Sequence, residues 1–126
     1  MKKSKSVILC VDDDQDTLDI LRVALESGGF KVVEALTGEQ GLKKFKAEKP
    51  DLLIVDLMME EVDTGTRFVT SLRALGNAAP VFLLSSVGDS LSQQTDYSDI
   101  GLAGVFQKPI DPKTLLMTVK AKLPRK

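Results

Sequence analysis

Leu52-Leu53-Ile54-Val55-Asp56 is a run of four apolar residues that ends in an aspartate. An uninterrupted apolar run of this length predicts a strand that is buried on both faces of a parallel sheet. Similar runs stand at residues 7–11, 81–84 and 103–106, whereas residues 31–35 alternate between polar and apolar side chains. Because alternation is typical of a strand with one exposed face, residues 31–35 are predicted to lie at an edge of the sheet.

Amphipathic segments separate these runs. In residues 15–27, Leu18, Leu21 and Leu25 fall on one helical face, and Gly28 follows as a stop signal. Residues 38–48 form a second such segment, for which Thr37 is a candidate N-cap. Helices are therefore predicted in both segments.

Three further helices are predicted in the second half of the chain. One follows Gly65 and includes the apolar residues Phe68 and Leu75, and the last opens at Asp111-Pro112 and continues to Leu123. Residues 89–100 have few apolar anchors, so a short or mobile helix is expected there. Strands that alternate with helices predict an α/β fold, a doubly wound parallel sheet covered on both faces.

Length and composition limit the classes of protein to consider. A chain of 126 residues, 43% apolar and 28% charged, fits one globular domain over residues 1–126, with a core at about 7–123. The net charge of -1 gives no sign of direct nucleic-acid binding. No apolar run suits a signal peptide or a membrane helix, and the single Cys10 lies within an apolar run, so a reducing, cytoplasmic location is expected.

Polar residues follow the predicted strands at their carboxyl ends, where open parallel sheets bind ligands. Asp12-Asp13-Asp14 follows the first strand, and Asp56, Ser85 and Lys108 follow three others. Clustered carboxylates repel one another unless a cation lies among them, and oxygen ligands without histidine favour Mg²⁺ over zinc. Helix capping is the alternative role for Asp14 and Asp16.

These residues occur in the order found in the receiver domains of bacterial response regulators, which the chain resembles from about Val7 to Leu123. The resemblance implies a flavodoxin-like (βα)₅ fold with strand order 2-1-3-4-5. It also implies that Asp56 is the phosphoacceptor and that Ser85 and Lys108 contact the phosphoryl oxygens. Mg²⁺ would be held by Asp12, Asp13, Asp56 and the backbone carbonyl of Met58.

The same resemblance implies partners. A sensor histidine kinase or phosphotransfer protein would supply the phosphoryl group, and a downstream protein, or an output domain absent from this chain, would respond to it. A homodimer is compatible with the family. A receiver is a signalling phosphoacceptor that catalyses only its own phosphorylation and dephosphorylation, and is not otherwise an enzyme.

Two departures from the family pattern stand out. Glu60 takes the place of a usual proline, in a loop that is apparently one residue longer, and Val105 stands where the family usually has Tyr or Phe. Phe106 is adjacent but should face the other side of the sheet. We therefore expect the output surface to differ from the common helix 4–strand 5–helix 5 face.

Two other functions remain as alternatives. The inserted loop and Val105 would suit a receiver-like interaction module that does not use phosphorylation, although Asp13, Asp56 and Lys108 are retained. A hydrolase with an aspartyl nucleophile would need an Asp-x-Asp-x-Thr/Val pattern after the first strand. The residue in the last position of that pattern here is Asp16, which does not fit.

Overall fold

The computed structural model describes residues 6–56, 71–72, 74–77, 79–86, 103–108 and 110–123. Its five-stranded parallel sheet has the order β2-β1-β3-β4-β5, which confirms the fold expected from the sequence. The strands are β1 Val7–Val11, β2 Lys31–Ala35, β3 Leu52–Asp56, β4 Val81–Ser86 and β5 Gly104–Lys108. The alternating segment, β2, is an edge strand as predicted.

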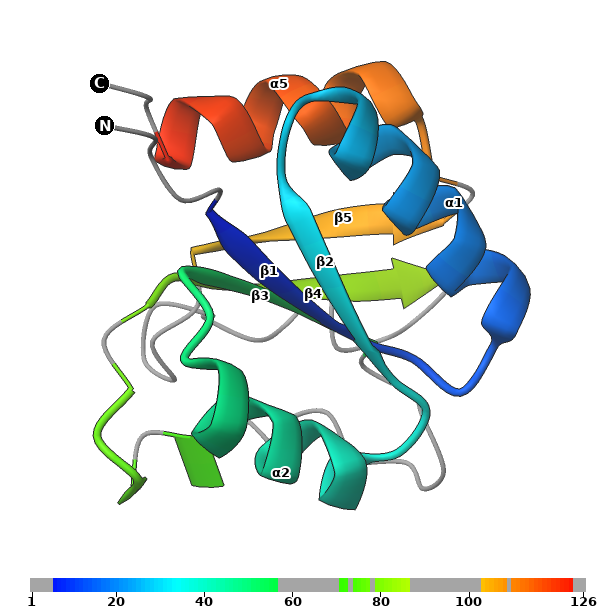
Figure 1. The fold of residues 1–126 in the computed structure, drawn as a ribbon. Coiled ribbons are helices and arrows are strands. Elements are labelled where there is room, and N and C mark those ends of the chain that lie inside the picture. Colours follow the sequence, from blue (N-terminus) through cyan, green and yellow to red (C-terminus); the bar gives the residue numbers. More distant parts are fainter. Residues whose placement is uncertain are drawn as a thin grey trace.

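Three helices are described in full: α1 Gln15–Ser27, α2 Gly38–Glu48 and α5 Pro112–Lys122. Helices α1 and α5 cover one face of the sheet and α2 lies on the other (Figure 1). Residues 71, 72 and 74 are helical, but most of the helix predicted after Gly65 lies outside the described residues, as does the segment 89–100. Of the helices in the described ranges, none is both long and apolar enough to cross a membrane.

The core has two layers, one on each side of the sheet. Alternate residues of the strands face each layer, so Ile54 packs with α1 and α5 while Leu53 and Val55 pack with the other cluster. Cys10 is a free cysteine, completely buried in the first layer, where burial raises the pKa of its thiol. It is therefore a small core residue, as the sequence predicts.

Strand β5 differs from its prediction at both ends. It begins at Gly104 rather than at residue 103, and it continues for two residues past Phe106. The extension pairs Gln107 with Ser85 and Lys108 with Ser86, because β4 also runs past Leu84. Apolar runs do not predict this pairing, because the residues at these strand ends are polar. The pairing fixes the backbone of Lys108 in the sheet.

Val105 and Phe106 face opposite layers, as predicted from strand alternation. Val105 is half-buried against the α2-side cluster, whereas Phe106 is buried against α1 and α5. The Phe106 ring stacks on Phe82 with centroids 5.0 Å apart. The aromatic ring of β5 is therefore part of the core in this structure.

Candidate functional site

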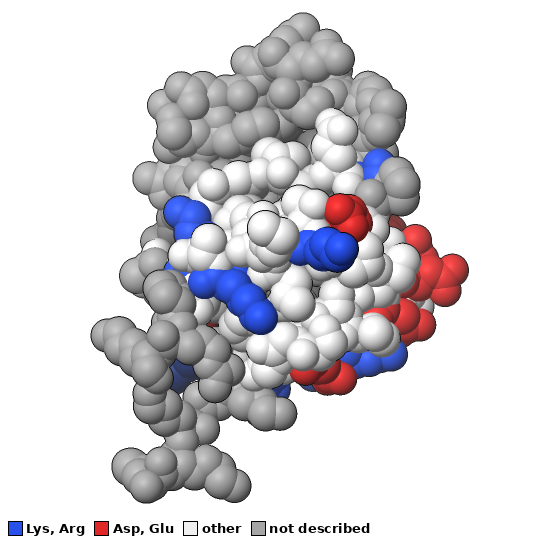
Figure 2. All heavy atoms as spheres, turned by 90° about the horizontal axis from the view of Figure 1, so that it is seen from above, with Lys and Arg blue, Asp and Glu red and all other residues white. Residues whose placement is uncertain are grey.

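An acidic cluster lies at the carboxyl ends of β1 and β3. Asp12 and Asp56 are buried, with 0% and 5% of their surface exposed, whereas Asp13 is exposed. One carboxylate oxygen from each of the three residues lies within 4.8 Å of the other two. Viewed from the side of α1 and α5, acidic side chains gather toward the end of the molecule at which the strands terminate (Figures 1 and 2).

Strand alternation explains why these side chains meet. The residues two positions before Asp12, Asp56 and Lys108 are Cys10, Ile54 and Phe106, and all three belong to the α1–α5 layer of the core. Side chains two residues apart point to the same face of a strand. Each polar side chain therefore lies on the face of the sheet that α1 and α5 cover, just beyond the last apolar residue of that face. The pattern that fills the core therefore also brings the charged groups together.

Lys108 joins the two buried carboxylates. Its Nζ lies 3.1 Å from Asp12 Oδ2 and 3.4 Å from Asp56 Oδ1, and 23% of its side chain is exposed. Burial alone would lower the pKa of the ammonium, but attraction to Asp56 and Asp12 outweighs that effect and raises the pKa overall. Lys108 is therefore a fixed positive charge at neutral pH.

Asp12 has the opposite balance of effects. Burial raises the pKa of its carboxyl, and the Asp14 N–H and Lys108 offset this only in part. Its Oδ1 accepts a hydrogen bond from Asp14 N at 2.9 Å. Its buried Oδ2 forms the ion pair with Lys108 but has no well-directed hydrogen bond within the described residues. That oxygen keeps a lone pair available for a cation.

The neighbouring acids have a structural role. Asp14 is the N-cap of α1, because its Oδ1 accepts from Asp16 N at 3.1 Å and its Oδ2 accepts from the Thr17 hydroxyl at 3.1 Å. Asp16 lies in the first turn of α1, where an acidic side chain favours the helix dipole. The capping alternative thus holds for Asp14, and the triple aspartate divides into two cluster residues and one cap.

Ser85 lies near the end of β4 and is 1% exposed. Asp56 pairs with Leu84 across the β3–β4 ladder, so Ser85 stands one residue farther toward the carboxyl edge. Met58 and Glu60 lie outside the described residues. The structure therefore brings together Asp12, Asp13, Asp56 and Lys108, and it places Ser85 at the same end of the sheet, where the strands terminate.

The donor set suits a hard divalent cation. Three carboxylates and one ammonium carry a formal charge of about -2 at neutral pH when all are ionised. Carboxylate oxygens, one of them buried without a hydrogen bond, match the oxygen ligands that Mg²⁺ prefers. The residues present therefore fit a magnesium ion.

Comparison with known proteins identifies the family. The family model for the response regulator receiver domain matches residues 8–120. The chain is 32% identical over 118 residues to the alkaline phosphatase synthesis transcriptional regulatory protein PhoP of Bacillus subtilis, covering 94% of this chain and 48% of that protein. It is 34% identical over 119 residues to the transcriptional regulatory protein PrrA of Mycobacterium tuberculosis, covering 94% and 50%.

Solved structures agree with this assignment. A CheY-like response regulator receiver domain protein from Methanospirillum hungatei superposes with a TM-score of 0.85 at 29% identity, covering 95% of this chain and 94% of that one. A chemotaxis response regulator of Vibrio cholerae gives 0.81 at 28% identity, covering 94% and 98%. The chain spans about half the length of the curated relatives PhoP and PrrA. On this evidence the chain belongs to the response regulator receiver domain family.

Proposed function

We propose that the chain is a phosphoacceptor whose Asp56 carboxylate receives a phosphoryl group and thereby changes the binding of a protein partner. The observation that carries this proposal is the position of Lys108, whose ammonium contacts both Asp12 and Asp56. A histidine kinase or a phosphotransfer protein is the expected donor. The responding partner would be a separate protein or an output domain of a longer chain.

The charges of the site explain how the transfer would work. A carboxylate and a phosphoryl donor are both anionic, so attack at phosphorus needs neutralising charge that is already in place. One Asp56 oxygen forms the new P–O bond, and the bond to the donor's leaving group breaks with its electron pair. The Lys108 ammonium, which contacts Asp56 in this structure, would then balance the negative charge of the transferred group.

Mg²⁺, held by Asp12, Asp13 and Asp56, would add further positive charge at the phosphoryl oxygens. Ser85 is expected to donate a hydrogen bond to one of these oxygens from the end of β4. Water would later hydrolyse the acyl phosphate, which regenerates the Asp56 carboxylate and frees inorganic phosphate. The chain would therefore be a signalling phosphoacceptor rather than an enzyme for other substrates.

Intact mass tests the proposal directly. After incubation with Mg²⁺ and a small-molecule phosphodonor, the parent chain should gain one phosphoryl group, and Asp56→Asn should gain none. The Asp51→Asn variant is a matched control, since Asp51 is exposed at the opposite end of β3, and it should be modified like the parent. If the parent stays unmodified even with a histidine kinase as donor, the phosphorylation-independent interaction module becomes the better description.

Asp13→Asn should remove most of the stabilisation that Mg²⁺ gives. At ten times its Kd, a ligand that binds only the folded state raises the free energy of unfolding by about 1.4 kcal/mol. Because Asp13 is exposed, its replacement should change metal-free stability by less than about 0.5 kcal/mol. Urea unfolding with and without Mg²⁺ measures both quantities.

Asp16→Asn is the control for that experiment, because Asp16 is also exposed but lies outside the carboxylate cluster. It should keep the full response to Mg²⁺. An Asp13→Asn protein with the same Mg²⁺ response as the parent would show that Asp13 is not a ligand.

A further inference from the structure

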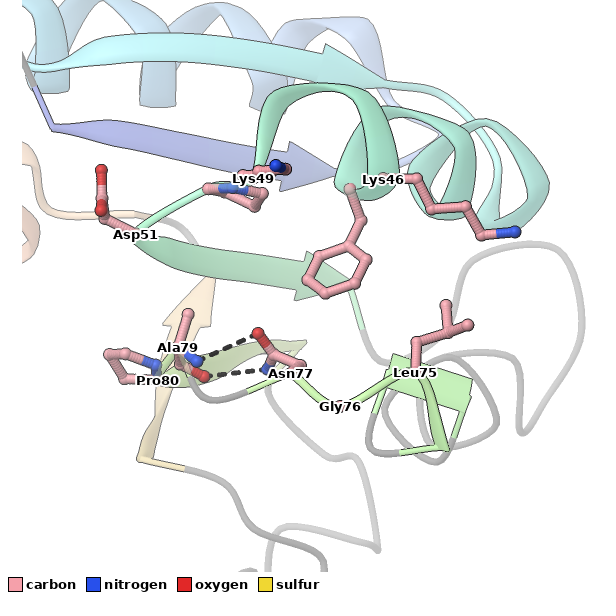
Figure 3. Close-up of a pocket in the computed structure, with 10 residues that line it drawn as sticks. Lys46, Lys49, Asp51, Leu75, Gly76, Asn77, Ala79 and Pro80 are labelled. Atoms are coloured by element: carbon pink, nitrogen blue, oxygen red, sulfur yellow. Dashed lines mark hydrogen bonds between the residues drawn. The ribbon is translucent and has the colours of Figure 1, made fainter.

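A groove lies at the end of the sheet opposite to the acidic cluster. It has a volume of about 690 Å³ and is lined by the last turn of α2 and by the residues that precede β3 and β4 (Figure 3). Asp56 ends β3, whereas this groove borders Pro50 and Asp51 at the other end of the same strand. Its size lies within the range of small-molecule sites.

Hydrogen bonds hold both walls of the groove. On the α2 wall, Lys49 has φ 49° and its N–H donates to Phe45 O at 3.1 Å. On the other wall, the Asn77 side chain donates to Ala79 O and accepts from Ala79 N, each at 3.0 Å (Figure 3). A ligand would therefore meet a largely preformed surface, which reduces the entropy that binding costs.

The groove has an apolar floor and rim. Phe45 is half-buried against the α2-side core, and 46% of Leu75 is exposed. Figure 3 shows Leu75 extending from one wall toward α2, with Lys46 and Lys49 on the α2 wall. Pro80, which is half-buried, adds further apolar surface, and Pro50 is buried beneath the groove. An exposed leucine beside a preformed hollow is a candidate contact for an apolar group.

The charge at the groove is positive. Lys46 and Lys49 are both exposed, and neither forms an ion pair with any residue that the structure describes. The Asp51 carboxylate also lines the groove, and its Oδ2 accepts a hydrogen bond from Val7 N at 2.8 Å, so two lysines and one aspartate leave a net positive charge. Lysines near the end of α2 complement the helix dipole, but that role does not explain the apolar hollow beside them.

We propose that this groove binds a small amphipathic anion. An apolar, flat body would lie against Phe45 and Leu75, and an acid group would face the ammonium group of Lys46 or of Lys49. The occupant follows from the combination of a hollow of this size, exposed apolar surface and two lysines that form no ion pair with the described part of the chain. The site is independent of phosphoryl transfer at Asp56.

Two related dyes test the inference. 8-Anilinonaphthalene-1-sulfonate carries an acid group, and N-phenyl-1-naphthylamine has the same rings without it. The sulfonate should bind the native protein with a Kd on the order of tens of micromolar, measured by its fluorescence. The uncharged dye should bind about fivefold more weakly, because it has no acid group to face either lysine.

Variants place the dye in the groove. The Lys46→Gln/Lys49→Gln pair should weaken sulfonate binding about fivefold, and Leu75→Asp should weaken it about tenfold. Lys43→Gln/Lys44→Gln is the matched control, since both residues are exposed on α2 outside the groove, and it should bind like the parent. Circular dichroism checks that each variant is folded.

The proposal is overturned if the native protein does not bind the sulfonate, or if the two dyes bind equally well. It is also overturned if Leu75→Asp binds like the parent, which would place the dye elsewhere. Equal losses in the two lysine pairs would mean that the general charge of α2, and not this groove, attracts the anion.

Discussion

Lys108→Met should lower the rate of phosphoryl incorporation at Asp56 by about 100-fold, the usual effect of removing one preorganised charge from a reacting centre. Methionine keeps much of the length of the side chain but has no positive charge. The Asp56 carboxylate would remain in place at the end of β3, so the loss should reflect chemistry and not position. Intact mass measured over time with a fixed concentration of phosphodonor gives the rate.

The same change should destabilise the metal-free protein at pH 7 by about 2 kcal/mol, because two buried carboxylates lose their counter-ion. This is less than the full effect of breaking a buried pair, since Lys108 is reached by solvent. Mg²⁺ should restore part of the loss by supplying positive charge at the same cluster.

The loss should depend on pH in a defined direction. The pKa of Asp12 is raised in the folded protein, so folding takes up a proton just above the ordinary pKa of 3.8, and stability falls as the pH rises through this range. Without Lys108 the pKa of Asp12 rises further, so the destabilisation should be largest at neutral pH and shrink toward pH 4. The raised pKa of Lys108 itself reflects stability that is fully present below the ordinary value of 10.5 and is lost as the pH rises above it.

Lys120→Met is the control for both measurements, because Lys120 is exposed on α5 and away from the acidic cluster. It should leave the rate and the unfolding free energy close to those of the parent. A Lys108→Met protein that is phosphorylated at the parent rate would show that the ammonium is not needed for the transfer.

The sequence is informative about the site because the same periodicity builds the core and the site. Apolar runs identify the strands, and the residues that follow them fall at one edge of any parallel sheet. Asp12, Asp56 and Lys108 could therefore be grouped before the structure was known. Asp13 could be added from the family resemblance, and the structure then separates it from Asp14, whose side chain caps α1.

Other features could not be predicted from the pattern. The contact between Lys108 and Asp12 depends on how far β5 extends past Phe106, and polar residues at a strand end carry no periodic signal. The groove below α2 is formed by segments that are separated in the chain, and neither Lys46 nor Leu75 stands out in the sequence. Such features arise from packing between elements rather than from any one element.

Ile54→Ala should lower the free energy of unfolding by about 3 kcal/mol, a large part of the roughly 5–15 kcal/mol typical of a domain. Ile54 has no exposed surface and lies on β3, the central strand, between β1 and β4. Its neighbours are held in the sheet on both sides and are covered by α1 and α5, so the cavity left by the lost atoms cannot collapse easily.

Val32→Ala provides the comparison. Val32 lies on the edge strand β2, where it pairs with Ile8 of β1, and it is only partly buried. Its replacement should cost about 1 kcal/mol, since less apolar surface is lost and the edge can relax. Urea unfolding of both variants gives the difference. Equal losses of unfolding free energy in the two variants would contradict the expectation that the central strand β3 contributes more to the core than the edge strand β2. Because Ile54 stands two residues before Asp56, the Ile54→Ala protein should also show whether phosphorylation at the strand end tolerates a weakened strand.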